Sequence, residues 1–125
     1  GVGDLPGEFR RILVDAPCTG SGTLRRRPEI ALRLGPDDPA RMGELQTRIL
    51  RNAAGLAGPG GRVVYAVCSA FREEAEDVLA RVDDLLEPVP FDSNGLDVLQ
   101  GVTSVRLLPL AHGTDGYFVA SLRRR

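Results

Sequence analysis

Two short apolar runs, each leading to a cysteine, constrain the fold of this chain more than any other feature. The first run ends at Asp15, three positions before Cys18, and the second, residues 62–67, ends directly before Cys68. Short apolar runs bounded by turn-forming residues are typical of buried strands. Because ligands bind at the carboxyl ends of strands in an open α/β sheet, we expect two thiols and a carboxylate at one sheet edge. Such a set of groups suits cysteine chemistry on a small planar substrate.

The composition indicates one ordinary α/β domain. The chain has 125 residues, of which 42% are apolar and 5% aromatic, so its core consists mainly of aliphatic side chains. A formal net charge of -1 argues against binding nucleic acid by general electrostatics. Two distant cysteines and a single histidine make neither a disulfide framework nor a metal site. No apolar run reaches the ~20 residues of a membrane span and no secretory signal is visible, so we expect a cytoplasmic protein.

The periodicity predicts the order strand, helix, strand, helix, strand, strand. The four predicted strands are Arg11–Asp15, 62–67, 105–110 and 116–122. Turn residues between the last two strands, at 112–116, indicate an antiparallel pair. The order predicts a parallel α/β sheet with an antiparallel hairpin at one side.

Capping signals delimit the two predicted helices. Asp38 as N-cap, with Pro39 at the first helical position, starts the first helix, and the glycine-rich residues 58–61 end it. Ser69 is the expected cap of the second helix, whose apolar stripe continues to Leu86. Residues 17–39 form a long irregular stretch, which inside a compact domain is typical of a functional loop.

Four segments carry recognisable motifs. They are Asp15-Ala16-Pro17-Cys18-Thr19-Gly20-Ser21-Gly22 with Leu24-Arg25-Arg26-Arg27-Pro28-Glu29; Leu56-Ala57-Gly58-Pro59-Gly60-Gly61-Arg62-Val63-Val64-Tyr65; Cys68-Ser69 with Glu73-Glu74-Ala75-Glu76; and Gly113-Thr114-Asp115-Gly116-Tyr117-Phe118-Val119-Ala120. Together they resemble the RNA (cytosine-5)-methyltransferases of the Sun/nucleolar-protein (RsmB-like) family, in order and over nearly the whole chain. The chain departs from the family pattern at Val67, Arg72 and Ala75, where the family usually has Thr, Pro and Asn.

The resemblance implies a partial class I S-adenosylmethionine-dependent methyltransferase sheet, which is Rossmann-like. Residues 1–125 would be a single domain, the C-terminal portion of the catalytic domain. The glycine-rich loop that holds most of the cofactor in such sheets is absent from this sequence. We therefore expect the remainder of the sheet to come from elsewhere, and S-adenosylmethionine to be the cofactor of the completed domain.

The resemblance also implies roles for individual residues. Cys68 would be the nucleophile that attacks cytosine, Cys18 would assist release of the product, and Asp15 would hydrogen-bond the base. The cofactor would contact Asp15, Ala16 and Pro17. The substrate would be rRNA or tRNA with an unpaired or extruded cytosine.

Three adjacent arginines complete the predicted site. Arg25, Arg26 and Arg27 are candidates for binding RNA phosphate, although a solvated charged loop explains them nearly as well.

Other interpretations of the same residues stay open. A lone cysteine is often a small apolar filler, and Asp15 can simply cap a turn. A phosphatase-type loop beginning at Cys18 would need an arginine where Leu24 stands. A truncated, inactive module is the stronger alternative. Such a module would leave one edge of the strand Arg11–Asp15 unpaired, so we expect this edge to pair with the missing half of the domain or with a second copy.

Overall fold

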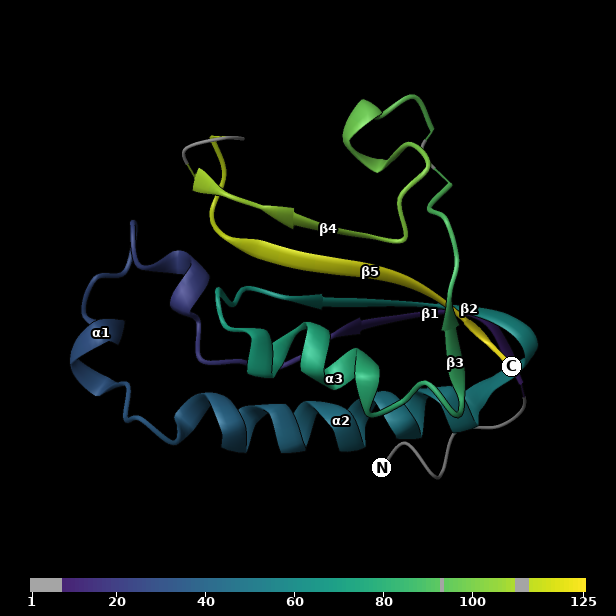
Figure 1. Ribbon diagram of the computed structural model, residues 1–125, viewed down its shortest axis with the longest axis horizontal. Helices are drawn as coiled ribbons and strands as arrows, with labels where there is room; N and C mark the ends of the chain where they lie inside the picture. Colours follow the sequence, from purple (N-terminus) through teal and green to yellow (C-terminus); the bar gives the residue numbers. More distant parts are fainter. Residues whose placement is uncertain (1–7, 93, 110–112) are drawn as a thin grey trace.

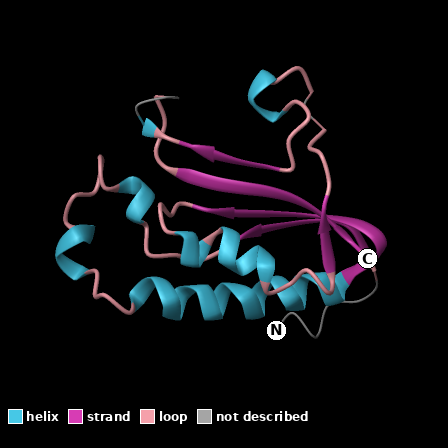
Figure 2. Ribbon diagram, in the orientation of Figure 1, coloured by secondary structure: helices cyan, strands magenta, loops and turns pink. Residues whose placement is uncertain are grey.

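The computed structural model describes residues 8–92, 94–109 and 113–125, which form a mixed sheet with two helices along one side (Figures 1 and 2). The strands are β1 (Phe9–Asp15), β2 (Ala57–Val67), β3 (Leu86–Pro88), β4 (Ser104–Leu107) and β5 (Tyr117–Arg124). The helices are α1 (Ile30–Arg33), α2 (Asp38–Leu56) and α3 (Glu76–Ala80), with one-turn 3₁₀ helices η2 (Ser21–Thr23), η3 (Arg72–Glu74) and η4 (Asp97–Leu99).

The sheet has five strands in the order β1-β2-β5-β3, and β4 also pairs with β5. β1 and β2 are parallel, whereas β5 is antiparallel to β2, β3 and β4. The predicted α/β class and the C-terminal antiparallel pair are therefore confirmed. β1 lies at the edge of the described sheet, where the side chain of Leu13 is 70% exposed.

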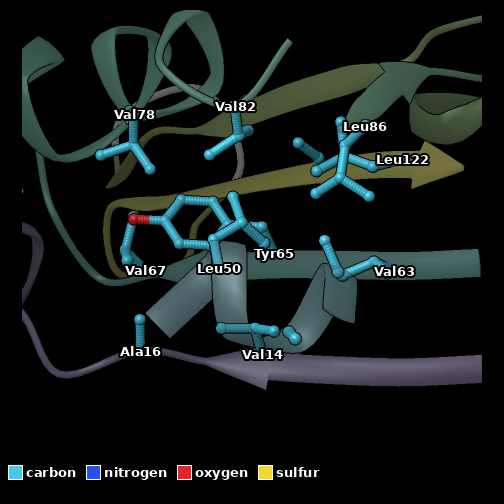
Figure 3. Close-up of a cluster of buried hydrophobic side chains, with 14 of the residues drawn as sticks. Val14, Ala16, Leu50, Val63, Tyr65, Val67, Val78, Val82, Leu86 and Leu122 are labelled. Carbon is cyan, nitrogen blue, oxygen red and sulfur yellow. The ribbon is translucent and has the colours of Figure 1, made fainter. Parts of the chain in front are cut away.

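The core lies between the sheet and helices α2 and α3 (Figure 3). Alternate residues of β2 point to these helices, and Tyr65 lies at the centre, surrounded by aliphatic side chains. The labelled neighbours in Figure 3 are Val14, Ala16, Leu50, Val63, Val67, Val78, Val82, Leu86 and Leu122. The core thus consists mainly of Val, Leu and Ala, with two buried aromatic side chains, Tyr65 and Phe118.

The first predicted helix is confirmed within one residue. α2 covers Asp38–Leu56, but its N-cap is Asp37, and the Asp38 carboxylate instead accepts a hydrogen bond from the Gly35 N–H at 2.8 Å. The helix ends at Leu56, directly before the glycine-rich residues, as predicted, but those residues belong to the first half of β2.

The second predicted helix is wrong in extent. Ser69 does not cap it; one turn of 3₁₀ helix comes first, and α3 covers only Glu76–Ala80. Ala75 interrupts the helix because its backbone lies outside the helical region, at φ -127° and ψ -99°. Leu86, the expected end of the apolar stripe, belongs to β3.

The predicted strand 105–110 and the turn after it can be compared with the structure only in part. Leu110 and His112 lie outside the described residues. Among the described residues, no helix combines the length and apolar character needed to cross a membrane.

Helix α2 touches the loop after β2 at a glycine. A Cβ atom added at Gly43 would lie 2.3 Å from the carbonyl oxygen of Glu73, far inside van der Waals contact. Gly55, in the same helix, has no atom within 4 Å of such a position. The approach of α2 to η3 therefore depends on the missing side chain at Gly43.

These two glycines form a matched pair for a stability test. We expect Gly43→Ala to lower the free energy of unfolding by about 1–3 kcal/mol, because backbone atoms must move apart. Gly55→Ala should leave it unchanged or raise it by up to about 1 kcal/mol, since alanine favours helix. Urea denaturation followed by circular dichroism measures both. Equal effects of the two substitutions would contradict the close packing of α2 on η3.

Candidate active site

The two cysteines predicted for one sheet edge lie side by side. The sulfur atoms of Cys18 and Cys68 are 3.0 Å apart, and neither forms a disulfide. Parallel pairing explains the contact, because β1 and β2 end at the same edge of the sheet. The pairing continues past β1 through a hydrogen bond from the Ala16 N–H to the Ala66 carbonyl at 3.1 Å.

Backbone hydrogen bonds join the two cysteine loops to the C-terminal hairpin. The Gly22 N–H donates to the Cys68 carbonyl at 3.0 Å, and the Gly116 N–H donates to the Gly22 carbonyl at 2.7 Å. A Cβ atom at Gly22 would lie 2.0 Å from the Gly116 carbonyl oxygen. The Gly-x-Gly element thus permits three loops to meet at backbone contact, and it places Cys18 beside Cys68.

A buried carboxylate lies directly behind the thiols. Glu74 is fully buried, and its oxygens accept hydrogen bonds from both the N–H and the hydroxyl of Thr19, at 2.8 and 2.7 Å. The hydroxyl of Ser69 also donates to it, as does the amide of Gln46 at 3.1 Å. The same carboxylate therefore contacts the residues that follow each cysteine.

Two further side chains connect this carboxylate with the core. The Gln46 amide also donates to the Pro17 carbonyl at 2.8 Å, and the Tyr65 hydroxyl donates to the Glu74 backbone carbonyl at 2.7 Å. Burial, with the nearby charge of Glu74, raises the pKa of Tyr65, so its hydroxyl remains a donor.

The Cys18 thiol holds its proton strongly. Burial first, and then the hydrogen bond with Cys68, raises its pKa to about 12. A thiol with a raised pKa is a poor nucleophile at neutral pH but remains able to donate a hydrogen bond.

The thiols open into a cavity of about 550 Å³ beside η2, α1 and the start of α2. Ile30 and Met42 supply apolar surface, and Arg27, Arg33 and Arg41 line the same cavity together with Asp38, whose carboxylate pairs with Arg41. Neither Arg33 nor Arg41 was identified from the sequence. The cavity thus combines two thiols with three arginines and one aspartate, an excess of positive charge that suits an anionic substrate.

The three arginines predicted to bind RNA have different environments. The Arg26 Nε donates to the Asp115 carboxylate at 2.6 Å, and Arg25 lies 3.7 Å from the same group. Asp115 is only 9% exposed, so this ion pair fastens the arginine loop to the C-terminal hairpin. Of the three, only Arg27 lines the thiol cavity.

The residues predicted to contact the cofactor lie at the end of β1. Ala16 and Pro17 line the thiol cavity, whereas Asp15 is exposed at the sheet edge and does not line it. The exposed carboxylate and the two following backbone units can form one wall of a cofactor site.

The sequence analysis did not identify Glu74 or Gln46 as site residues, although the sequence contains evidence for both. Glu74 belongs to the motif that begins at Cys68. Gln46 is a polar residue on the apolar stripe of α2, between Met42 and Leu50, and it is fully buried. A polar side chain in such a position must find a buried partner. In the described parts of the chain, no group of three or more His, Cys, Asp or Glu side chains is placed to hold a metal ion.

The fold and the site together define an α/β domain with paired thiols at the carboxyl edge of its sheet. The family model described as 16S rRNA methyltransferase RsmB/F matches residues 2–123. This chain belongs to that family.

Relatives agree in sequence and in structure. The chain is 38% identical over 129 residues to ribosomal RNA small subunit methyltransferase B of Thermus thermophilus, a match covering 96% of this chain and 30% of the relative. The crystal structure of a methyltransferase homolog protein from Pyrococcus horikoshii superposes with a TM-score of 0.78 at 34% identity, covering 99% of this chain and 42% of that one. NSun6 from P. horikoshii, solved with SFG, gives 0.81 at 26% identity, covering 98% and 32%.

The chain therefore spans between 30% and 42% of the length of these relatives. Their structures confirm the methyltransferase-type sheet predicted from the motifs.

The raised pKa of Cys18 predicts how its reactivity depends on pH. In the folded chain, alkylation of Cys18 by iodoacetamide should rise about tenfold per pH unit from about pH 7 to about pH 10 without levelling off. In the denatured chain, where a cysteine pKa is about 8.5, the rate should level off above that pH. Peptide mapping by mass spectrometry measures both rates.

The same shift affects stability with a definite sign. Because the folded state keeps this proton to higher pH than the unfolded state, the free energy of unfolding should fall as the pH rises above about 8.5. A folded-state alkylation rate that levels off near pH 8.5 would contradict the proposed protonation of Cys18.

Proposed function

We propose that the protein containing this chain methylates carbon 5 of cytosine in ribosomal RNA, with Cys68 as the covalent nucleophile. The observation that supports this most directly is the placement of two thiols, 3.0 Å apart, in one cavity. Its family consists of rRNA methyltransferases. Cytosine carbon 5 needs activation before it can accept a methyl group, and a thiol supplies that activation.

The contact between the thiols favours Cys68 as the nucleophile. Since Cys18 retains its proton, its S–H can donate to a Cys68 thiolate and stabilise the negative charge on that sulfur. The Cys68 sulfur then bonds to carbon 6, and the electron pair of the 5,6 double bond moves to carbon 5. After methyl transfer, a base removes the carbon 5 proton, the double bond re-forms and the sulfur–carbon bond breaks. Cys18, beside this bond, would assist the release.

S-adenosylmethionine, when bound, supplies the methyl group. Asp15, Ala16 and Pro17 would hold one side of it, because Asp15 ends β1 and the next two residues line the thiol cavity. NSun6 was solved with SFG, an analogue of this cofactor. The sequence contains no glycine-rich cofactor loop. The other side of the cofactor site would therefore come from the part of the family sequence that this chain does not cover. Asp15 would also hydrogen-bond the cytosine edge.

The RNA would enter over the arginine-lined wall of the cavity. Arg27, Arg33 and Arg41 can neutralise phosphates that flank an unpaired cytosine. Arg25 and Arg26 would act mainly through their ion pair with Asp115, which sets the shape of the loop.

A second proposal concerns the chain by itself, as a folded module without activity. The exposed edge of β1, at Arg11–Asp15, supports it, since an uncovered strand edge is a template for pairing. The partner would be the missing part of the domain or a second copy of the chain.

Substitution of each cysteine separates the two proposed roles. The protein tested contains this chain together with the part of the family sequence that the chain does not cover. In that protein, Cys68→Ala should reduce methyl transfer about a thousandfold or more and form no covalent RNA adduct. Cys18→Ala should form the adduct and accumulate it, because release is slowed. Denaturing gels with labelled RNA detect the adduct, and methyl incorporation measures activity. An adduct in Cys68→Ala but not in Cys18→Ala would reverse the assignment.

The salt dependence of RNA binding tests the arginine wall in the same protein. Arg33→Gln should weaken binding of a short single-stranded RNA and reduce the slope of log affinity against log salt by about 0.7, the loss of one phosphate contact. Arg48, exposed on α2 but outside the cavity lining, is the control, and Arg48→Gln should leave the slope unchanged. Equal slopes for both variants would remove Arg33 from the RNA path.

A further inference from the structure

The residues that follow the two thiols share one hydrogen-bonding partner. Thr19 comes directly after Cys18, and Ser69 comes directly after Cys68. Both donate to the carboxylate of Glu74, which lies 55 positions from Thr19 along the chain. A single side chain is therefore connected to both thiol-bearing loops.

The bonding pattern matches a charged carboxylate. Its two oxygens receive four donors: the Thr19 N–H, the hydroxyls of Thr19 and Ser69, and the Gln46 amide. An ionised carboxylate only accepts hydrogen bonds, so these donors satisfy it. Within the described residues, no Arg or Lys side chain lies within ion-pair distance of it. The hydrogen bonds alone thus offset the cost of burying this charge.

A buried charge held by donors from both cysteine loops and by Gln46 of helix α2 fixes the loops relative to each other and to the core. The Thr19 N–H belongs to the peptide group that follows Cys18, so its 2.8 Å bond to Glu74 fixes the backbone that carries this thiol. Ser69 also accepts a hydrogen bond from the Phe71 N–H at 3.1 Å, which orders the turn after Cys68. Moving either loop would take away one or two of the four donors, and a buried charge that loses hydrogen-bond partners is strongly unfavourable.

We propose that Glu74 is a positioning residue that sets the distance and orientation between the Cys18 and Cys68 sulfur atoms. Only the purpose of this geometry rests on the proposed function. In that function the thiols hydrogen-bond to each other before Cys68 attacks, and Cys18 assists release afterwards. Glu74 itself does not touch substrate, since it is fully buried behind the loops.

Thiol–disulfide exchange in this chain measures the geometry without RNA or cofactor. One molecule of oxidised glutathione and the two cysteine thiols give one intramolecular disulfide and two molecules of reduced glutathione. The equilibrium constant reports how well the two sulfur atoms are held together. Glu74→Gln keeps the size of the side chain but replaces an accepting oxygen with a donor, and we expect it to lower this constant at least tenfold.

Tyr65→Phe is the matched control. It removes the 2.7 Å hydrogen bond to the backbone carbonyl of Glu74 while leaving the carboxylate and its four donors in place. Tyr65→Phe should lower thermal stability but change the exchange constant less than twofold. A tenfold loss in this control would show that general loosening, not the carboxylate, determines the geometry, and would overturn the proposal.

Variants of Thr19 keep the test decisive even where Glu74→Gln fails to fold. Thr19→Val removes one hydroxyl donor and should lower the exchange constant several-fold, whereas Thr19→Ser retains the hydroxyl and should restore it. An exchange constant unchanged in both Glu74→Gln and Thr19→Val, or lowered equally by Val and Ser, would overturn the proposal. Because no methyl transfer is measured, this result is independent of whether the proposed RNA activity is correct.

Discussion

Parallel pairing of β1 with β2 is the constraint on which the rest of the structure depends. The register that places Asp15 opposite Ala66 makes the two strands finish together, so the chain segments that follow them leave the sheet as neighbours. Cys18 and Cys68 come from distant parts of the sequence, and they meet only because of this pairing. A one-residue shift of β1 would separate the thiols and would move the buried side chain of Val14 from the core to the opposite face of the sheet.

The sheet edge becomes a site through close backbone contact and one buried charge. Gly22 and Gly116 allow the first cysteine loop to enter between the second loop and the hairpin, where any side chain would collide. Glu74 then connects both loops to the core through hydrogen bonds, and the Arg26–Asp115 ion pair fastens the outer part of the first loop. Strand pairing brings the two thiols close together, and these contacts orient them, as the proposed attack of a thiol on a cytosine base requires.

Local patterns predicted much of the fold because the elements they describe depend on short-range physics. Helix α2 has a proline in its first turn and is followed by glycine-rich residues, and a segment rich in turn residues separates β4 from β5. The second helix was predicted too long. Its apolar spacing was real, but Ala75 leaves the helical conformation where the chain turns Glu74 inward to the cysteine loops. That competing tertiary interaction is not visible in a helical periodicity.

For the site, the sequence by itself determined that three reactive side chains, Asp15, Cys18 and Cys68, lie at or just after strand ends. It also showed that the motifs around them resemble those of RNA methyltransferases. Only the tertiary structure decided their relations: the 3.0 Å separation of the sulfur atoms, the division of Arg25–Arg27 between an ion pair and the cavity, and the position of Glu74 behind both loops. The physical reason is that strand ends follow from local apolar patterns, whereas distances between loops depend on register, backbone contact and burial. Those quantities arise only when distant segments pack against one another.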